Sequence, residues 1–118
     1  MRICILSNAH PSNDVRLYYK LGMSLAKRHE VWLITATGLP NDRTNPYQVV
    51  VEPDTPRLAL KHIYHEAMKI KPDLVICVEP LTLFTGKALK RKLKCKVIFD
   101  VHEFFPDAFA ERFPLPFR

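Results

Sequence analysis

Apolar residues follow two kinds of pattern along this chain, and these patterns predict strands and helices in turn. Short apolar runs rich in β-branched residues predict strands at about residues 2–7, 31–35, 47–52, 74–78 and 96–101. Apolar residues spaced three or four positions apart predict helices at about residues 14–29, 55–71 and 81–94. This order favours a single α/β domain over residues 1–118, with a Rossmann-like parallel sheet and helices on both faces.

Local signals set the helix starts and the buried side of the first helix. Asn13-Asp14 can cap the first helix, and Thr55 followed by Pro56 is typical of an N-cap and first turn. The positions expected to face the sheet are Tyr18, Leu21, Gly22 and Leu25. Those expected to face solvent are Arg16, Lys20, Met23 and Lys27.

Polar residues follow three of the predicted strands directly. His102 and Glu103 end the last apolar run, Ser7 to His10 follow the first strand, and Glu79 follows the strand from Leu74. Ligand groups in open parallel sheets lie just past the carboxyl ends of such strands, so these residues are expected at one edge. Ser7 near His10 has no G-x-S-x-G elbow around it and is interpreted as a strand terminus.

The basic residues are clustered. The chain has 18 Lys and Arg against 12 Asp and Glu, a net charge of +6. The spacing i, i+3, i+4, i+7 puts four of them on one helix face, namely Lys87, Lys90, Arg91 and Lys94. This stripe is either a solvated helix surface or a contact for an anionic membrane. Nucleic acid is not expected as a partner, because no alternating aromatics and no nucleic-acid motif accompany the stripe.

Other chemistry is not expected. Cys4, Cys77 and Cys95 form no C-x-x-C pair and are interpreted as buried reduced thiols. No G-x-G-x-x-G follows the first strand, so a dinucleotide cofactor is not predicted. His62, His65 and Glu66 share one side of the second helix but lack further converging ligands, and no metal is predicted.

Several segments together carry a family resemblance. Four segments resemble the amino-terminal, acceptor-side domain of GT-B glycosyltransferases of family 4. They are Met1 to Ser7 with His10-Pro11, Asp14-Val15-Arg16, Ser24 to Val31, and Asp100-Val101-His102-Glu103. The resemblance covers almost the whole chain. It implies a retaining enzyme that transfers a sugar from a nucleotide-sugar donor to a glycan or lipid-linked acceptor in envelope polysaccharide synthesis.

The resemblance also implies roles and partners. His102 would face the donor sugar as the catalytic residue, while the loop near His10 would lie under the same cleft. The donor nucleotide would bind a second domain that this chain does not contain, so the isolated chain is predicted to be inactive. The chemistry of the side chains, apart from the resemblance, predicts substrate-binding residues: Glu79 and Glu103 to orient the acceptor, and His10, Asp14 and Arg16 to shape the first loop. Alternatively, Asp14 and Arg16 are charges at a helix terminus and Glu79 belongs to a turn before Pro80.

Two further expectations remain open. The alternative function is a stand-alone, non-catalytic module that binds a sugar or phosphate or acts in assembly. Because no apolar run approaches the roughly 20 residues of a membrane span and no signal peptide is recognised, the chain is expected in the cytoplasm, with peripheral contact at the inner face of the membrane as a further option.

Overall fold

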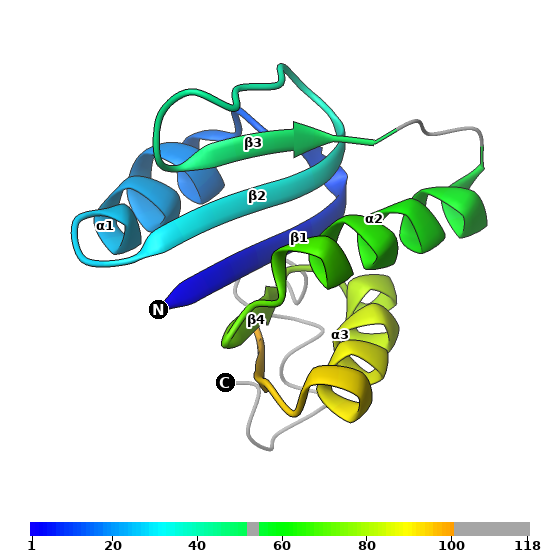
Figure 1. Cartoon of the computed structure of the whole chain (residues 1–118). Helices are drawn as coiled ribbons and strands as arrows, with labels where there is room; N and C mark the ends of the chain where they lie inside the picture. Colours follow the sequence, from blue (N-terminus) through cyan, green and yellow to red (C-terminus); the bar gives the residue numbers. More distant parts are fainter. Residues whose placement is uncertain (52–54, 101–118) are drawn as a thin grey trace, which may run out of the picture.

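One parallel sheet organises the chain in the computed structural model, which describes residues 1–51 and 55–100 (Figure 1). Its strand order is β3-β2-β1-β4-β5. The strands are β1 (Arg2–Pro11), β2 (Glu30–Thr37), β3 (Tyr47–Val50), β4 (Leu74–Cys77) and β5 (Lys96–Phe99). The helices are the π-helix η1 (Val15–Gly22), α1 (Met23–Ala26), α2 (Pro56–Ile70) and α3 (Pro80–Leu93). The predicted α/β fold with a Rossmann-like parallel sheet is confirmed.

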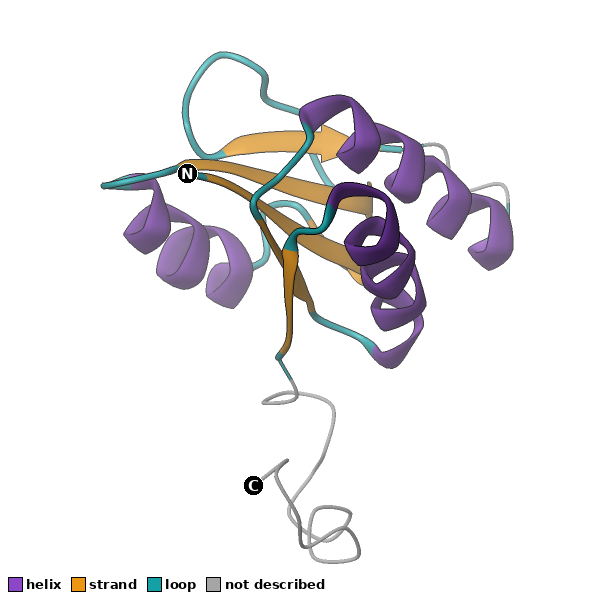
Figure 2. Ribbon diagram, turned by 60° about the horizontal axis from the view of Figure 1, so that its bottom comes forward, coloured by secondary structure: helices purple, strands orange, loops and turns teal. Residues whose placement is uncertain are grey.

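Helices cover both faces of the sheet, as Figure 2 shows from a second direction. The two faces follow from the alternation of side chains along β1. Ile3 and Ile5 point to the face that η1 and α1 cover, where Leu17 is fully buried. Cys4 and Leu6 point to the opposite face, where they pack with residues of α2 and α3.

The connections reverse direction next to β1. The chain proceeds outward from β1 through β2 to β3, and then crosses over to β4 and β5 on the other side of β1. The segment after β1 therefore leads to η1 on one face, whereas the segment after β4 leads to α3 on the opposite face. In open α/β sheets, ligands bind in a crevice just outside the carboxyl ends of the strands at such a reversal, which here are the ends of β1 and β4.

Gly86 lets α3 approach the sheet closely. A Cβ atom at this position would lie 2.5 Å from Cys77 Sγ and 3.1 Å from Val97 Cγ1, closer than packed atoms allow. The absence of a side chain therefore brings α3 directly onto β4 and β5. This close contact fixes the position of the helix whose N-terminus borders the crevice.

The first helix differs from its predicted form. It begins where expected, because the Asp14 carboxylate accepts hydrogen bonds from the amides of Arg16 (2.9 Å) and Leu17 (3.1 Å). It then forms a π-helix, in which the amide of Met23 bonds to the Tyr18 carbonyl five residues earlier, and α1 ends at Ala26 instead of His29. Leu17 is buried on the face toward the sheet, and Tyr18, Leu21 and Leu25 pack there as predicted.

Candidate functional site

The site lies at the crevice between the carboxyl ends of β1 and β4. β1 runs four residues further than predicted, to Pro11, so Ser7 lies within the strand and is not its terminus. The two strands pair up to Leu6 and Cys77, and the amide of Val78 donates to the Leu6 carbonyl at 3.1 Å. The end of β1 and the residue Glu79 therefore lie side by side.

Glu79 is the centre of the site. Its carboxylate is buried, with 5% of the side chain exposed, and it accepts hydrogen bonds from the end of β1. Oε1 accepts from the amide of Asn8 at 3.0 Å, and Oε2 accepts from the amide of Ala9 at 3.2 Å and from the hydroxyl of Ser7. These donors provide the compensation that a buried carboxylate requires. Glu79 also serves as the N-cap residue of α3.

His10 is oriented by Glu79. Its Nδ1 lies 2.9 Å from Glu79 Oε2, and its side chain remains 20% exposed. An ionised carboxylate can only accept, so Nδ1 carries the proton in this contact and the ring is fixed in one orientation. Two hydrogen bonds therefore link His10 to its neighbours in the crevice, because its backbone amide also donates to Ser7 Oγ at 3.0 Å.

The same geometry excludes a serine nucleophile activated by His10. Ser7 Oγ donates its proton to Glu79 and lies 3.4 Å from Nδ1 of His10, the nitrogen that already faces the carboxylate. In a catalytic triad the serine and the carboxylate bind opposite nitrogens of the histidine. Ser7 is therefore a structural partner of Glu79, and sequence patterns gave it no such role.

Arg16 links the start of η1 to the end of β5. Its guanidinium NH1 lies 2.6 Å from Oδ2 of Asp100, and each side chain is 21% exposed. Asp100 is also anchored through its amide, which donates to the Cys77 carbonyl at 2.9 Å. The prediction that Arg16 faces solvent is wrong, because this ion pair draws the side chain over the edge of the sheet.

Asp100 was not among the predicted site residues, although a sequence signal for it exists. It is the first polar residue after the apolar run of β5, the same pattern that identified Glu79 after β4. The other predicted polar residue of the first helix, Asp14, directs its carboxylate to the helix amides, as an N-cap does. His102 and Glu103 lie outside the described residues.

The three cysteines are buried in the core between the sheet and helices α2 and α3. Burial raises the pKa of the Cys77 thiol to about 12, and it also raises the pKa values of Cys4 and Cys95. Thiolate is the nucleophilic form of cysteine, so all three side chains are inert near neutral pH.

Helix α2 carries the histidines that superficially suggest a metal site. His65 packs its ring edge against Tyr64, and Glu66 pairs with Lys69 at 3.5 Å. Within residues 1–51 and 55–100, no three His, Cys, Asp or Glu side chains come together as a metal site needs. None of the helices in these ranges combines the length and apolar content that crossing a membrane requires.

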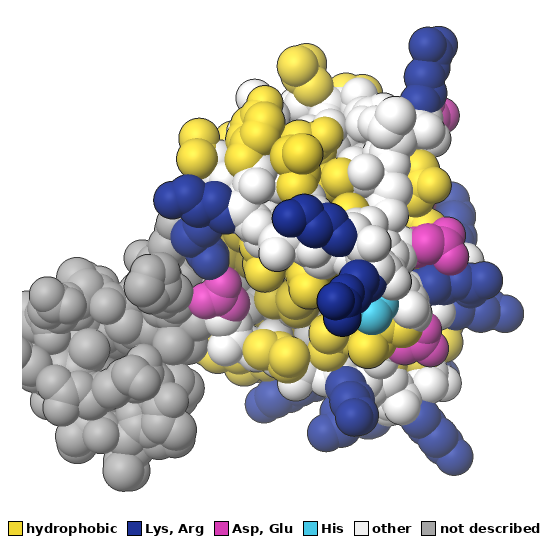
Figure 3. Space-filling view, turned by 90° about the vertical axis from the view of Figure 1, so that its left-hand side faces the viewer, with side chains coloured by type: hydrophobic (Ala, Val, Ile, Leu, Met, Phe, Trp, Pro, Cys, Tyr) yellow, Lys and Arg dark blue, Asp and Glu magenta, His cyan; other side chains and the backbone are white. Residues whose placement is uncertain are grey.

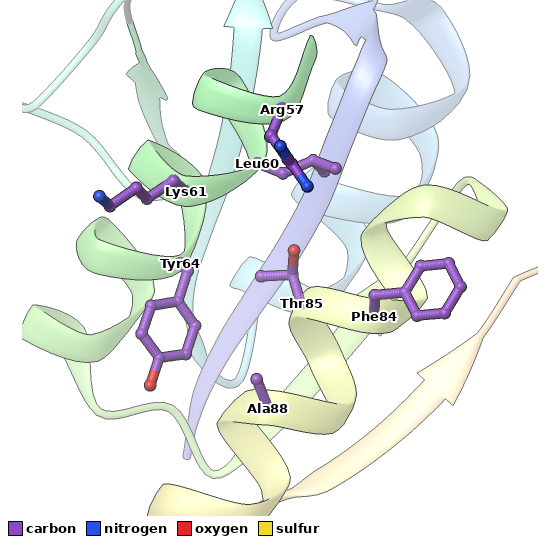
Figure 4. Close-up of a pocket in the computed structure, with 7 residues that line it drawn as sticks. All are labelled: Arg57, Leu60, Lys61, Tyr64, Phe84, Thr85 and Ala88. Carbon is purple, nitrogen blue, oxygen red and sulfur yellow. The ribbon is translucent and has the colours of Figure 1, made fainter.

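The basic stripe lies on α3 as its spacing predicted. Lys87, Lys90, Arg91 and the C-cap residue Lys94 are all exposed. Beside them, a groove of about 370 Å³ runs between α2 and α3 (Figure 4). Its lining is mainly apolar and comes from Arg57, Leu60, Lys61, Tyr64, Phe84, Thr85 and Ala88.

Comparisons of the chain with protein-family models, curated proteins and solved structures found no match.

Proposed function

We propose that this domain holds the acceptor in a retaining glycosyl transfer from a nucleotide-sugar donor. The observation that carries the proposal is the pairing of Glu79 with His10 at the crevice where the connections of the sheet diverge. Two predicted substrate-binding residues, far apart in sequence, form one hydrogen-bonded unit there. The family resemblance supplies the reaction type, and the crevice supplies groups suited to a sugar hydroxyl.

The end of β1 favours a hydroxyl ligand over a phosphate. Rossmann-like domains that bind nucleotides use the backbone amides at this position to hold phosphate oxygens. Here the amides of Asn8 and Ala9 already donate to the carboxylate of Glu79. A phosphate approaching them would meet a negative charge instead of open donors, so the crevice suits the acceptor better than the donor nucleotide.

His10 is the residue through which Glu79 acts on the acceptor. The imidazole of His10, held by the carboxylate of Glu79, is the group that meets the acceptor hydroxyl. When His10 accepts the proton of the acceptor hydroxyl, its ring becomes positively charged, and the carboxylate of Glu79 stabilises that charge. Glu79 is therefore a positioning residue: it is buried and orients the acceptor only through His10 and the strand end.

The remaining parts of the reaction belong to other groups. The pair of Arg16 and Asp100 holds the exit of β5 at the same edge, two residues before His102, to which the resemblance gives the contact with the donor sugar. The nucleotide binds a second domain that closes over the crevice. As that domain would work with nucleotide sugars made inside the cell, we place the protein in the cytoplasm.

Nuclear magnetic resonance titration tests the acceptor site. Amide signals of the ¹⁵N-labelled chain are followed while short oligosaccharides, nucleotide sugars and inorganic phosphate are added separately. We expect an oligosaccharide to shift the amides of Asn8, Ala9 and His10, and His10→Gln to abolish the shift. If phosphate shifts them and no oligosaccharide does, the domain is a phosphate-binding module and the proposal fails.

A second assay separates a transferase from a sugar-binding module. This domain, joined to the nucleotide-binding domain that the proposal requires, is incubated with a panel of nucleotide sugars and the oligosaccharide that binds. Mass spectrometry should detect a product that is one sugar heavier, with Glu79→Gln lowering the rate by about 10²-fold. Binding without any product would leave a non-catalytic module.

A further inference from the structure

The layer formed by α2 and α3 is strongly basic. Nine of the 18 Lys and Arg residues of the chain lie in residues 56–71 and 80–94, together with a single acidic residue, Glu66. The basic excess of these two segments is larger than the +6 net charge of the whole chain, so the remaining residues are net acidic. Glu66 pairs with Lys69 and offsets one of these charges, which leaves a net charge of +8 on the two segments.

The helices on the opposite face of the sheet carry a smaller basic excess, because residues 14–29 hold four Lys and Arg against one acidic residue, Asp14. Figure 3, which views the molecule from the left-hand side of Figure 1, shows Asp and Glu side chains among the Lys and Arg side chains. The positive charge is therefore greatest on the α2–α3 layer.

The exposed side of α3 changes character along its length. Near its N-terminus it presents Leu81 and Phe84, which are 44% and 68% exposed, and further on it presents the basic stripe. Figure 4 shows Phe84 on α3 at one side of the groove that it helps to line, while Arg57 lies over the space between the two helices. The apolar end of α3 is the end next to Glu79 and the candidate site.

We infer that the α2–α3 face docks on an anionic phospholipid bilayer, with Phe84 entering the interface. Basic residues spread along both helices, with the exposed side chains of Leu81 and Phe84 beside them, match a continuous surface that is both anionic and apolar. Docking places the apolar end of α3, and with it the crevice of Glu79 and His10, beside the bilayer. Resting on the proposed function, this geometry makes the acceptor a lipid-linked glycan.

Vesicle sedimentation tests the surface. The chain is mixed with vesicles of phosphatidylglycerol and phosphatidylcholine, or of phosphatidylcholine alone, at low and high salt. We expect binding to the anionic vesicles only, weakened strongly by salt because the Debye length falls from about 30 Å at 0.01 M to about 3 Å at 1 M. Replacing Lys87, Lys90, Arg91 and Lys94 by Gln should lower the affinity about tenfold or more.

Matched variants on the opposite side of the sheet provide the controls. Phe84→Ala should lower affinity about fivefold, while Tyr19→Ala, which removes a 58% exposed ring from η1, should leave it unchanged. Replacing Lys20, Lys27 and Arg28 by Gln should change affinity far less than the α3 set. In the chain with Phe84→Trp, brominated lipids should quench the new fluorescence, and in Tyr19→Trp they should not.

Three results would overturn the inference. The first is equal binding by the parent chain and the α3 variants, and the second is equal binding to anionic and neutral vesicles. The third is binding of polyglutamate that competes with the vesicles and is unchanged by Phe84→Ala. None of them affects the oligosaccharide titration of the crevice, so the docking surface and the acceptor site fail independently. Loss of amide shifts at Asn8 to His10 with intact vesicle binding would instead remove only the assignment of a lipid-linked acceptor.

Discussion

Replacing the buried carboxylate of Glu79 by an amide should cost a large part of the stability of the fold. The carboxylate faces four donors, and only one oxygen remains in Glu79→Gln. If the amide oxygen takes the place of Oε2, the new NH₂ group opposes the amide of Asn8, and the other bonds lose the assistance of the negative charge. One unsatisfied donor costs about 1–3 kcal/mol, and weaker neighbouring bonds bring the loss to about 2–4 kcal/mol.

Urea unfolding followed by fluorescence measures this loss. Trp32 is the only tryptophan of the chain and lies on β2 against Tyr47, so its emission reports on the sheet. The control is Glu66→Gln on α2, which removes only a contact with Lys69 at 3.5 Å and should change the free energy of unfolding by less than about 0.5 kcal/mol. A loss below about 0.5 kcal/mol for Glu79→Gln as well would refute the central place of Glu79 in the crevice.

Three further predictions concern the packing of α3 and the buried thiols. Gly86→Ala should lower the free energy of unfolding by about 1–3 kcal/mol, because its Cβ would overlap Cys77 Sγ, and an unchanged urea midpoint would contradict the close contact. The thiols should react with a disulfide reagent at pH 8 only as fast as the chain unfolds. Burial raises the pKa of Cys77 from 9.0 to about 12, so as the pH rises the unfolded chain loses the thiol proton before the folded chain does. The free energy of unfolding should therefore fall between these two pH values, and it should fall less steeply in Cys77→Ala.

Much of the fold follows from local sequence signals. Thr55 caps α2 as predicted, with its hydroxyl accepting from the amide of Leu58 at 3.1 Å, and α2 spans Pro56–Ile70 in agreement with its apolar spacing. The strands also lie where short β-branched runs predict them. These features depend on neighbouring residues, so the sequence alone contains the information that specifies them.

The departures have nonlocal causes. The polar residues after Ser7 extend β1 because Pro11 pairs with Thr37 and the intervening amides bind Glu79, a residue 70 positions away. Arg16 leaves the solvent side of its helix for Asp100, 84 positions away. Periodicity describes one element at a time, and contacts of this kind exist only once the sheet is assembled.

The candidate site shows the same division. The rule that polar residues gather at the carboxyl edge correctly placed His10 and Glu79 together, because the ends of parallel strands meet there. It did not predict that Glu79 would be buried and that its carboxylate would accept hydrogen bonds from the amides of β1. That outcome depends on β4 being the neighbour of β1, a fact of strand order that no local pattern contains.

The built-in carboxylate also relates the two proposed surfaces to each other. At the crevice, Glu79 occupies the amides that would otherwise attract anions, while the basic residues of the chain concentrate on α2 and α3. An acceptor consisting of a neutral sugar on an anionic lipid carrier presents both chemistries in one molecule. The carrier's charge would meet the basic face, and the sugar hydroxyl would meet His10, so that each surface receives the part of the acceptor that its own charge favours.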